Sequence, residues 1–127
     1  MSGVLFDSDF ILSLFFMEES THVQAQKIYQ GLAACDEYIL PHVHWEVITV
    51  CSRKYGHVRS HDLHRIIATQ LKRVVTVPDE LEVWKEFFSH SKKSISFVDC
   101  ANRVTARKYG WKIASFDAFY PKSLRLI

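Results

Sequence analysis

Residues 4–9 read VLFDSD, a short apolar run that ends in two carboxylates, Asp7 and Asp9. Three consecutive apolar residues, too few for a helix, indicate a short buried strand. Similar runs recur along the chain and alternate with longer segments in which apolar residues follow helical spacing. This alternation predicts an α/β fold in which a mostly parallel sheet of four or five strands lies between two layers of helices.

The expected elements are short strands and longer helices. Strands are expected at residues 4–6, 38–40, 74–77, 111–115 and 124–127. Helices are expected at residues 10–16, 21–34, 42–55, 61–71, 79–89 and 98–109. Gly56 and Gly110 follow two of these helices and are expected to end them. In the helix at 79–89 we expect Leu81, Trp84, Phe87 and Phe88 to face the core.

Length, composition and charge bound the class of protein. The chain has 127 residues, about the length of one domain, so residues 1–127 are expected to form a single domain. Hydrophobic residues make up 48% and charged residues 24%, which excludes a disordered, collagen-like or coiled-coil chain. Lys and Arg number 16 against 14 Asp and Glu, a net charge of +2, so bulk charge does not predict a nucleic-acid partner.

Three features favour a soluble protein of a reducing compartment. Cys35, Cys51 and Cys100 are widely spaced and form no C-x-x-C pair, so we expect free thiols rather than disulfides or a zinc site. The longest apolar stretch, residues 10–17, is far shorter than the ~20 residues of a membrane span. The first residues carry no basic leader. We therefore expect a cytoplasmic protein without a membrane partner.

Four carboxylates stand at or near the carboxyl ends of the expected strands or at the starts of helices. They are Asp7, Glu46, Asp99 and Asp117. In a parallel sheet the carboxyl ends of the strands share one edge, and ligands bind there. Carboxylates gathered at one place repel each other, and a hard divalent cation, Mg²⁺ or Mn²⁺, relieves that repulsion. Such an ion also lowers the pKa of a bound water and neutralises charge on a phosphate, as hydrolysis of a phosphodiester requires.

Each acid, taken alone, also has a structural explanation. Asp7 can cap the helix that follows it, and Asp117 can stabilise a turn. Asp99 stands at capping-box spacing from Ser96. Glu46 is harder to explain in this way, because its helix is largely apolar and offers no obvious cationic partner.

The four acids lie in four motifs. These are residues 4–9 (VLFDSD), Leu40-Pro41 leading to Trp45-Glu46-Val47, residues 96–100 (SFVDC) and residues 111–119 (WKIASFDAF). In this order and spacing they resemble the motifs of PIN-domain ribonucleases, above all VapC-type toxins, across essentially the whole chain. The resemblance implies a three-layer α/β/α PIN-like domain with Mg²⁺- or Mn²⁺-dependent endoribonuclease activity. It also implies the toxin of a type II toxin–antitoxin system, a homodimer restrained by a cognate antitoxin protein that binds an apolar groove near the N-terminal helices.

The resemblance also assigns roles to residues. The family's acidic quartet, catalytic and metal-binding, corresponds to Asp7, Glu46, Asp99 and Asp117. The supporting residues are Ser96, Asp9 and Ser115. Asp9 stands where the family often has Asn or Ser, which leaves open whether it binds metal. Candidate RNA contacts, which are also explained as ordinary solvent-facing charges, are Arg103, Arg107, Lys92 and Lys93.

Other classes of protein share parts of this pattern. A phospho-acceptor receiver domain, a signalling module, also carries acids at strand ends and would use Asp79 after the strand at 74–77. Residues 7–9 (DSD) resemble the opening motif of haloacid-dehalogenase phosphatases. A catalytically silent PIN scaffold is a further alternative. His57, His61 and His64 share one helix face, where solvent-facing histidines are commoner than a zinc site.

Overall fold

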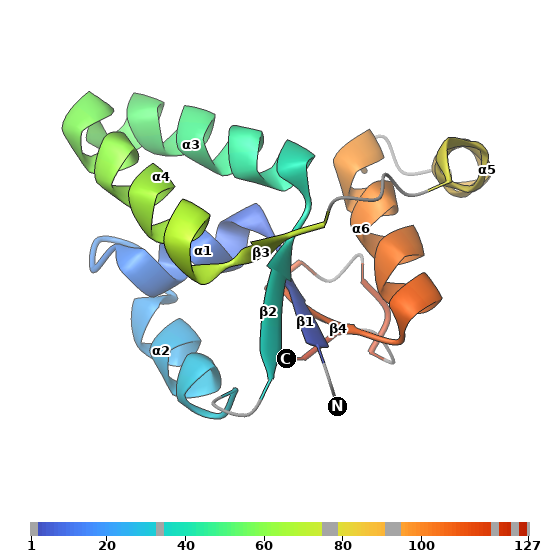
Figure 1. Ribbon diagram of the computed structural model, residues 1–127, viewed down its shortest axis with the longest axis horizontal. Helices are drawn as coiled ribbons and strands as arrows, with labels where there is room; N and C mark the ends of the chain where they lie inside the picture. The colour runs from blue at the N-terminus through green and yellow to red at the C-terminus, as the bar shows by residue number, and fades with distance from the viewer. Residues whose placement is uncertain are drawn as a thin grey trace.

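Four parallel strands form the sheet of the computed structural model, which describes residues 3–32, 35–74, 79–90, 95–117, 120–122 and 125–126. The strands are β1 (Gly3–Phe6), β2 (Asp36–Ile39), β3 (Lys72–Arg73) and β4 (Lys112–Ala114). Their order across the sheet is β3-β2-β1-β4. Leu5 of β1 lies opposite Tyr38 of β2 on one side and Ile113 of β4 on the other. All four carboxyl ends therefore lie along one edge of the sheet (Figure 1).

Helices cover both faces of this sheet. They are α1 (Ser8–Phe15), α2 (His22–Gln30), α3 (Pro41–Tyr55), α4 (His57–Gln70), α5 (Glu80–Ser89) and α6 (Phe97–Tyr109). Helices α1 to α4 lie on one side of the sheet, and α5 and α6 lie on the other (Figure 1). The expected three-layer α/β/α architecture with a parallel sheet is confirmed.

Strand β1 lies at the centre of the core because both helix layers cover it. Val4, Leu5 and Phe6 are at most 1% exposed. The Phe6 ring meets the Phe10 ring of α1 edge to face, with centroids 5.3 Å apart. A strand covered on both faces has no solvent-facing positions, which is why its sequence is an uninterrupted apolar run. Asp7 is the next residue, so its position is fixed by a strand that is packed on both faces.

Several elements begin or end elsewhere than expected. Helix α1 begins at Ser8 rather than residue 10, because Asp7 caps it. Helix α4 begins at His57 rather than residue 61, because Gly56, with φ of 92°, both ends α3 and precedes the first turn of α4. Helix α2 ends at Gln30. Residues 33–34, which the expected helix includes, lie outside the described residues.

The later strands also differ from expectation. Strand β3 occupies Lys72–Arg73 rather than residues 74–77, of which 75–77 lie outside the described residues. Strand β4 is shorter than the expected 111–115. In the expected fifth strand, Arg125 forms an isolated parallel bridge with Ile113, while residues 124 and 127 lie outside the described residues.

The expected orientation of helix α5 is confirmed for Phe87, which packs against the core, and is wrong for the other three residues. Leu81, Trp84 and Phe88 are 62%, 45% and 67% exposed, and α5 buries Val83 instead. The Trp84 and Phe88 rings stack on each other with centroids 5.3 Å apart. Apolar residues at helical spacing define a stripe but do not say whether that stripe meets the core or the surface, so the pattern was ambiguous.

The cysteines agree with the expectation of free thiols. Cys51 and Cys100 are buried, Cys35 is half-buried, and all three are reduced. Within the described ranges, every helix is too short or too polar to cross a membrane.

Candidate active site

Asp7 lies at the carboxyl end of β1 and caps helix α1. Its Oδ1 accepts a hydrogen bond from the Ser8 backbone N–H at 2.8 Å, and its backbone is extended, as a capping residue requires. The residue is only 5% exposed. The capping role considered from the sequence is therefore present, and it fixes a buried carboxylate at the edge where a ligand is expected.

Two buried residues that the sequence analysis missed, Tyr120 and Asn102, bind this carboxylate. The Tyr120 hydroxyl donates to Asp7 Oδ2 at 2.9 Å and lies 3.4 Å from Asp99 Oδ1. The Asn102 amide donates to Asp7 Oδ1 at 3.3 Å and to the Tyr120 hydroxyl at 3.1 Å. Because one hydroxyl reaches both carboxylates, Asp7 and Asp99 are neighbours in space although they are distant in sequence.

The sequence contained a weak signal for one of these residues. Asn102 follows Asp99 by three positions on α6, so the two share a helix face, and its helical neighbours on that face are small or apolar. A polar residue in such a stripe needs a partner. Tyr120 carried no comparable signal, because it belongs to the segment after β4, whose path the sequence does not define.

The environment of Asp7 disfavours its charge. Burial, followed by the charge of Asp9, raises its pKa to about 7, and the charge of Asp99 adds to the effect, while hydrogen bonds from Ser8 and Tyr120 oppose it. Among the described residues, no Lys or Arg forms an ion pair with Asp7, Asp9 or Asp99. The site thus holds negative charge that the described part of the chain does not neutralise.

Asp99 has two roles that use different oxygens. Its Oδ2 accepts from the Ser96 backbone N–H at 3.0 Å, and the Ser96 hydroxyl accepts from the Asp99 backbone N–H at 3.0 Å, so the two residues form the capping box of α6. Its Oδ1 remains on the side of Tyr120 and Asp7. The capping box therefore orients Asp99 toward the site, and Ser96 has the supporting position expected of it.

Asp9 fastens the segment that carries Asp117. Its Oδ1 accepts from the Ser115 hydroxyl at 3.0 Å, and its Oδ2 accepts from the Phe116 backbone N–H at 2.8 Å. The Ser115 hydroxyl in turn accepts from the Asp117 backbone N–H at 3.0 Å. Burial raises the pKa of Asp9, hydrogen bonds from Phe116 and Ser115 oppose the rise, and the Asp117 charge adds to it. Both Asp9 oxygens are engaged by these donors, so its position is that of an anchor for Asp117.

Helix α3 supplies Glu46. It stands in the second turn of α3, is exposed, and makes no hydrogen bond or ion pair with any described residue. Asp117 is also exposed. Within the described ranges, no three His, Cys, Asp or Glu side chains are close enough together to hold a metal ion. The structure thus brings Asp7 and Asp99 together, with Asp9 beside Asp7, and the places of Glu46 and Asp117 in the site stay predictions.

The paired carboxylates fit a small, hard cation. Mg²⁺ retains several waters and is bound by one or two carboxylates together with substrate phosphates, so it does not need a complete cage of protein ligands. A desolvated carboxylate with a raised pKa and no cationic neighbour is what such an ion would neutralise. The donor set, all carboxylate oxygen, also matches the preference of Mg²⁺ and Mn²⁺.

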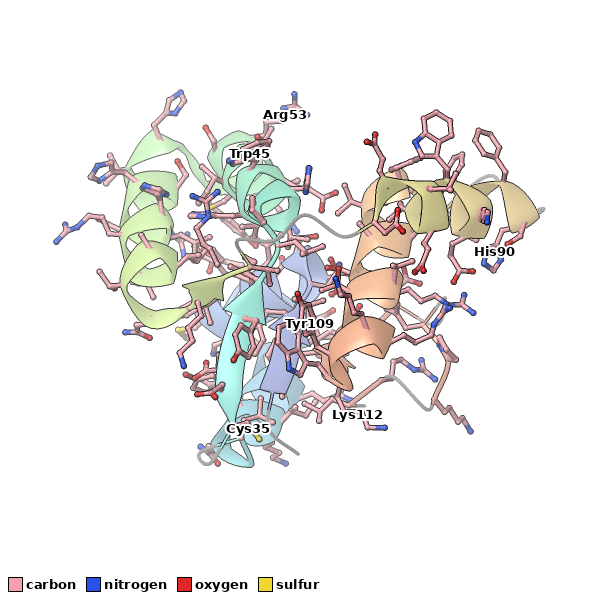
Figure 2. All side chains as sticks on the ribbon, turned by 45° about the vertical axis from the view of Figure 1, so that its right-hand side comes forward. Cys35, Trp45, Arg53, His90, Tyr109 and Lys112 are labelled. Atoms are coloured by element: carbon pink, nitrogen blue, oxygen red, sulfur yellow. The ribbon has the colours of Figure 1, made fainter. Side chains whose placement is uncertain are left out.

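The basic residues of α6 form ion pairs within the protein. Arg107 pairs with Glu86 of α5, and Arg103 Nε lies 3.5 Å from the same carboxylate. His90, at the end of α5, lies 3.4 Å from Glu86 and 3.3 Å from Arg103 (Figure 2). These pairs brace α5 against α6. Lys92 and Lys93 lie outside the described residues, so a role in binding RNA stays a prediction for all four cations.

Comparison with known proteins identifies the family. The family model of the PIN domain matches residues 4–121. The chain belongs to the PIN domain family. Two solved structures resemble this PIN domain. VapC20 of Mycobacterium tuberculosis, described as a toxin that cleaves the sarcin-ricin loop, superposes with a TM-score of 0.82 and 22% identity over 93% of this chain and 92% of that one.

FitAcB of Neisseria gonorrhoeae superposes on this PIN domain with a TM-score of 0.60 and 15% identity over 90% of this chain and 87% of that one. No protein of curated function matches the sequence. At these identities the two superpositions establish the shared fold. The family match confirms the resemblance to PIN domains that the four motifs predicted.

Proposed function

We propose that this PIN domain is a metal-dependent endoribonuclease and the toxin of a type II toxin–antitoxin system, acting in the cytoplasm. The observation that carries the proposal is the approach of Asp7 and Asp99 to one Tyr120 hydroxyl at the carboxyl edge of the sheet. The family match and the likeness to a VapC toxin support it. The family match also argues against the receiver-domain and dehalogenase alternatives. Asp79, which a receiver would need as its phospho-acceptor, is an exposed helix cap.

The proposed cofactor is Mg²⁺ or Mn²⁺. When bound, it supplies a water of lowered pKa and positive charge opposite the scissile phosphate. Asp7 and Asp99 would bind it, while Tyr120 and Asn102 hold the Asp7 carboxylate in a fixed orientation. Asp9 and Ser115 would position Asp117 as a further ligand. Glu46, which is exposed on α3, would bind the ion directly or through a water molecule.

Water rather than the ribose 2′-hydroxyl is the proposed nucleophile. Among the described residues no histidine hydrogen-bonds to Asp7, Asp9 or Asp99, whereas metal-independent ribonucleases use a pair of histidines at the reacting bond. Attack by water breaks the bond to the 3′ oxygen and leaves products with 5′-phosphate and 3′-hydroxyl ends. The chemistry then requires no 2′-hydroxyl on the substrate.

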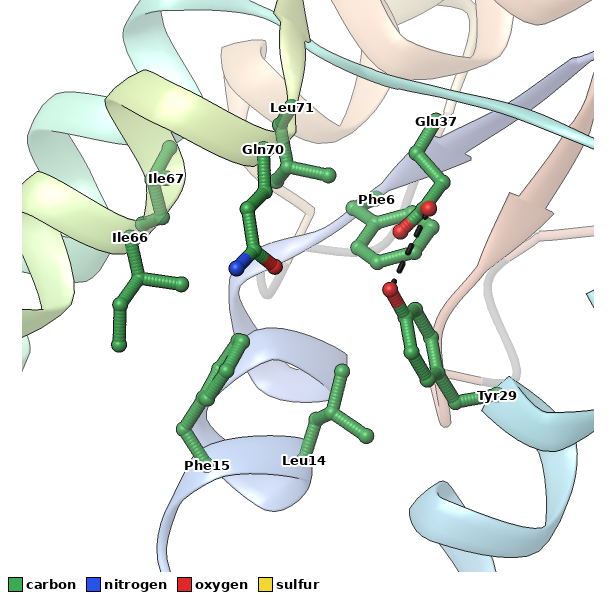
Figure 3. A pocket seen from close by; sticks show the side chains of 9 residues that line it. All are labelled: Phe6, Leu14, Phe15, Tyr29, Glu37, Ile66, Ile67, Gln70 and Leu71. Atoms are coloured by element: carbon green, nitrogen blue, oxygen red, sulfur yellow. Dashed lines mark hydrogen bonds between the residues drawn. The ribbon is translucent and has the colours of Figure 1, made fainter. Parts of the chain in front are cut away.

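We also propose that an antitoxin segment binds the apolar surface between α1, α2 and α4. A small pocket there is lined by Phe6, Leu14, Phe15, Tyr29, Glu37, Ile66, Ile67, Gln70 and Leu71 (Figure 3). An adjoining hollow of about 350 Å³ shares Leu14 and Phe15 with it. Phe15 is 37% exposed, although it belongs to an otherwise buried helix. We further propose that the protein forms the homodimer that the resemblance implies.

The test is digestion of total RNA by the wild-type protein with Mg²⁺, followed by mapping of the product ends. We expect 5′-phosphate ends, no cleavage in EDTA, and loss of cleavage by orders of magnitude in Asp7→Asn. Cyclic phosphate ends or full activity in EDTA would overturn the mechanism. A protein that folds and binds Mn²⁺ but cleaves no RNA would favour the silent scaffold.

A further inference from the structure

A second pocket lies at the edge of the sheet that carries the acids. It has a volume of about 300 Å³ and is lined by His44, Trp45, Ile48, His64 and Arg73. We call it the Trp45–Arg73 pocket. Helix α3 contributes the first three residues, α4 contributes His64, and Arg73 is the last residue of β3.

The sheet register fixes where this pocket lies relative to the candidate active site. Leu5 of β1 pairs with Tyr38 of β2, and Tyr38 pairs with Lys72 of β3. Arg73 therefore leaves the sheet at the same edge as Asp7 and two strands away, about 10 Å along the edge. An extended polynucleotide with one phosphate at the acids would place a neighbouring nucleotide at this distance.

The pocket concentrates groups that carry or can carry positive charge. His44 is 4% exposed and its Nε2 lies 3.0 Å from His64 Nδ1. Burial lowers the pKa of His44, and the charges of His64 and Arg73 lower it further. None of the described residues that line the pocket is acidic. The lining therefore contains the Arg73 cation and two imidazoles and no carboxylate, in contrast to the neighbouring acidic site.

Two lining side chains have no evident role in the fold. Trp45 is 63% exposed, with its ring edge to face against the His42 ring at 5.6 Å. Arg73 is exposed and forms no ion pair with a described residue. By contrast, Arg103 and Arg107 are both occupied by Glu86. An exposed indole stacks on any nucleobase, and a guanidinium matches a phosphate with two parallel hydrogen bonds.

We propose that the Trp45–Arg73 pocket is a nucleotide-binding subsite for the RNA strand, in which a base stacks on Trp45 and its phosphate is bound by Arg73 and His64. The proposal rests on the proposed ribonuclease function. The cationic pocket offsets the repulsion between the acids and the phosphates of the incoming strand. It therefore explains how a chain with a net charge of only +2 can bind RNA beside a cluster of carboxylates.

The test measures RNA affinity in a protein that does not cleave its ligand. Asp7→Asn is titrated into a fluorescently labelled RNA hairpin in EDTA, and anisotropy gives the Kd. Trp45→Ala and Arg73→Gln are each added to this parent. Their matched controls are Trp84→Ala, an exposed Trp on α5, and Arg53→Gln, an exposed Arg on α3 that does not line the pocket (Figure 2).

We expect Trp45→Ala to raise the Kd by about fivefold or more, as loss of one base stack does. Arg73→Gln should weaken binding and reduce the slope of log Kd against log salt concentration by about one, as loss of one phosphate contact does. RNA should also quench tryptophan emission in the parent and much less in Trp45→Ala. Both controls should bind like the parent.

Several results would overturn the subsite. One is equal affinity of the pocket variants and the parent, and another is a parent that does not bind RNA. A third is that both pocket variants keep their RNA affinity but no longer bind an acidic antitoxin peptide. That result would assign the pocket to a protein partner. Failure of the ribonuclease proposal looks different, since wild-type protein with Mg²⁺ would then cleave no RNA whatever the pocket variants do.

Discussion

The strongest quantitative prediction concerns Asp7→Asn in the metal-free protein. An asparagine at this position can keep the cap, because its side-chain oxygen accepts from the Ser8 N–H in the same geometry. Its amide can donate to the Tyr120 hydroxyl, which then donates to Asp99 Oδ1, 3.4 Å away. The substitution therefore removes a buried charge and leaves the three donors that bind Asp7, from Ser8, Asn102 and Tyr120, with acceptors.

The size of the effect follows from the pKa of Asp7. Folding raises this pKa from 3.8 to about 7, so the folded state binds the proton more tightly and stability falls as the pH rises between these values. Above the folded-state pKa the cost is about 4 kcal/mol, at about 1.4 kcal/mol per unit of pKa. At about pH 5 the unfolded state has ionised but the folded state has not, and the cost is about 1–2 kcal/mol.

Asp7→Asn should therefore stabilise the protein in EDTA, and more at alkaline pH. The expected difference of about 3 kcal/mol between about pH 8 and about pH 5 corresponds to roughly 10 °C in the gain of Tm. Thermal denaturation of both proteins at the two pH values measures it. Asp79→Asn, at the exposed cap of α5, is the matched control and should change Tm equally at both. An Asp7→Asn protein that is destabilised to the same extent at both pH values would refute the reasoning, because Asp7 would then act only as a cap.

The other contacts give three further predictions. Tyr120→Phe removes a buried donor from Asp7 and should lower the free energy of unfolding, measured by urea denaturation, by about 1–3 kcal/mol; an unchanged value would contradict this bond. Ser96→Ala removes the α6 cap and should cost about 1 kcal/mol, with weaker RNA cleavage because Asp99 loses its orientation; Ser89→Ala, at the end of α5, is the control. Asp9→Ala releases the Ser115–Asp117 segment and should lower kcat about tenfold or more at unchanged RNA affinity. An unaltered kcat would mean that Asp117 needs no anchor.

Some of the site could be predicted from the sequence because burial leaves a direct trace in it. The run at residues 4–6 is apolar because β1 is covered on both faces, and Asp7 stands out because it interrupts that run. The capping box was equally readable, since Ser96 and Asp99 form it through local spacing alone. In both cases the residues that determine the geometry are neighbours in the sequence.

The remaining contacts join segments whose relative placement only the packed structure defines. Tyr120 reaches Asp7 across 113 positions, and His44 meets His64 across 20. His64 is exposed, as the sequence analysis expected, but helical spacing could not show that its ring also meets His44 of α3. The place of Glu46 among the acids stays a prediction, since a position near a strand end does not determine the direction in which a helical side chain points.

The most direct test of the central claim is binding of Mn²⁺ in the absence of RNA, followed by electron paramagnetic resonance of the free ion. The account predicts that wild-type protein depletes the free-ion signal and that Asp7→Asn and Asp99→Asn each weaken binding by about tenfold or more, as loss of a charged oxygen ligand should. Asp79→Asn should bind like the wild type. Equal Mn²⁺ affinity in all four proteins would contradict the claim that Asp7 and Asp99 form the metal site.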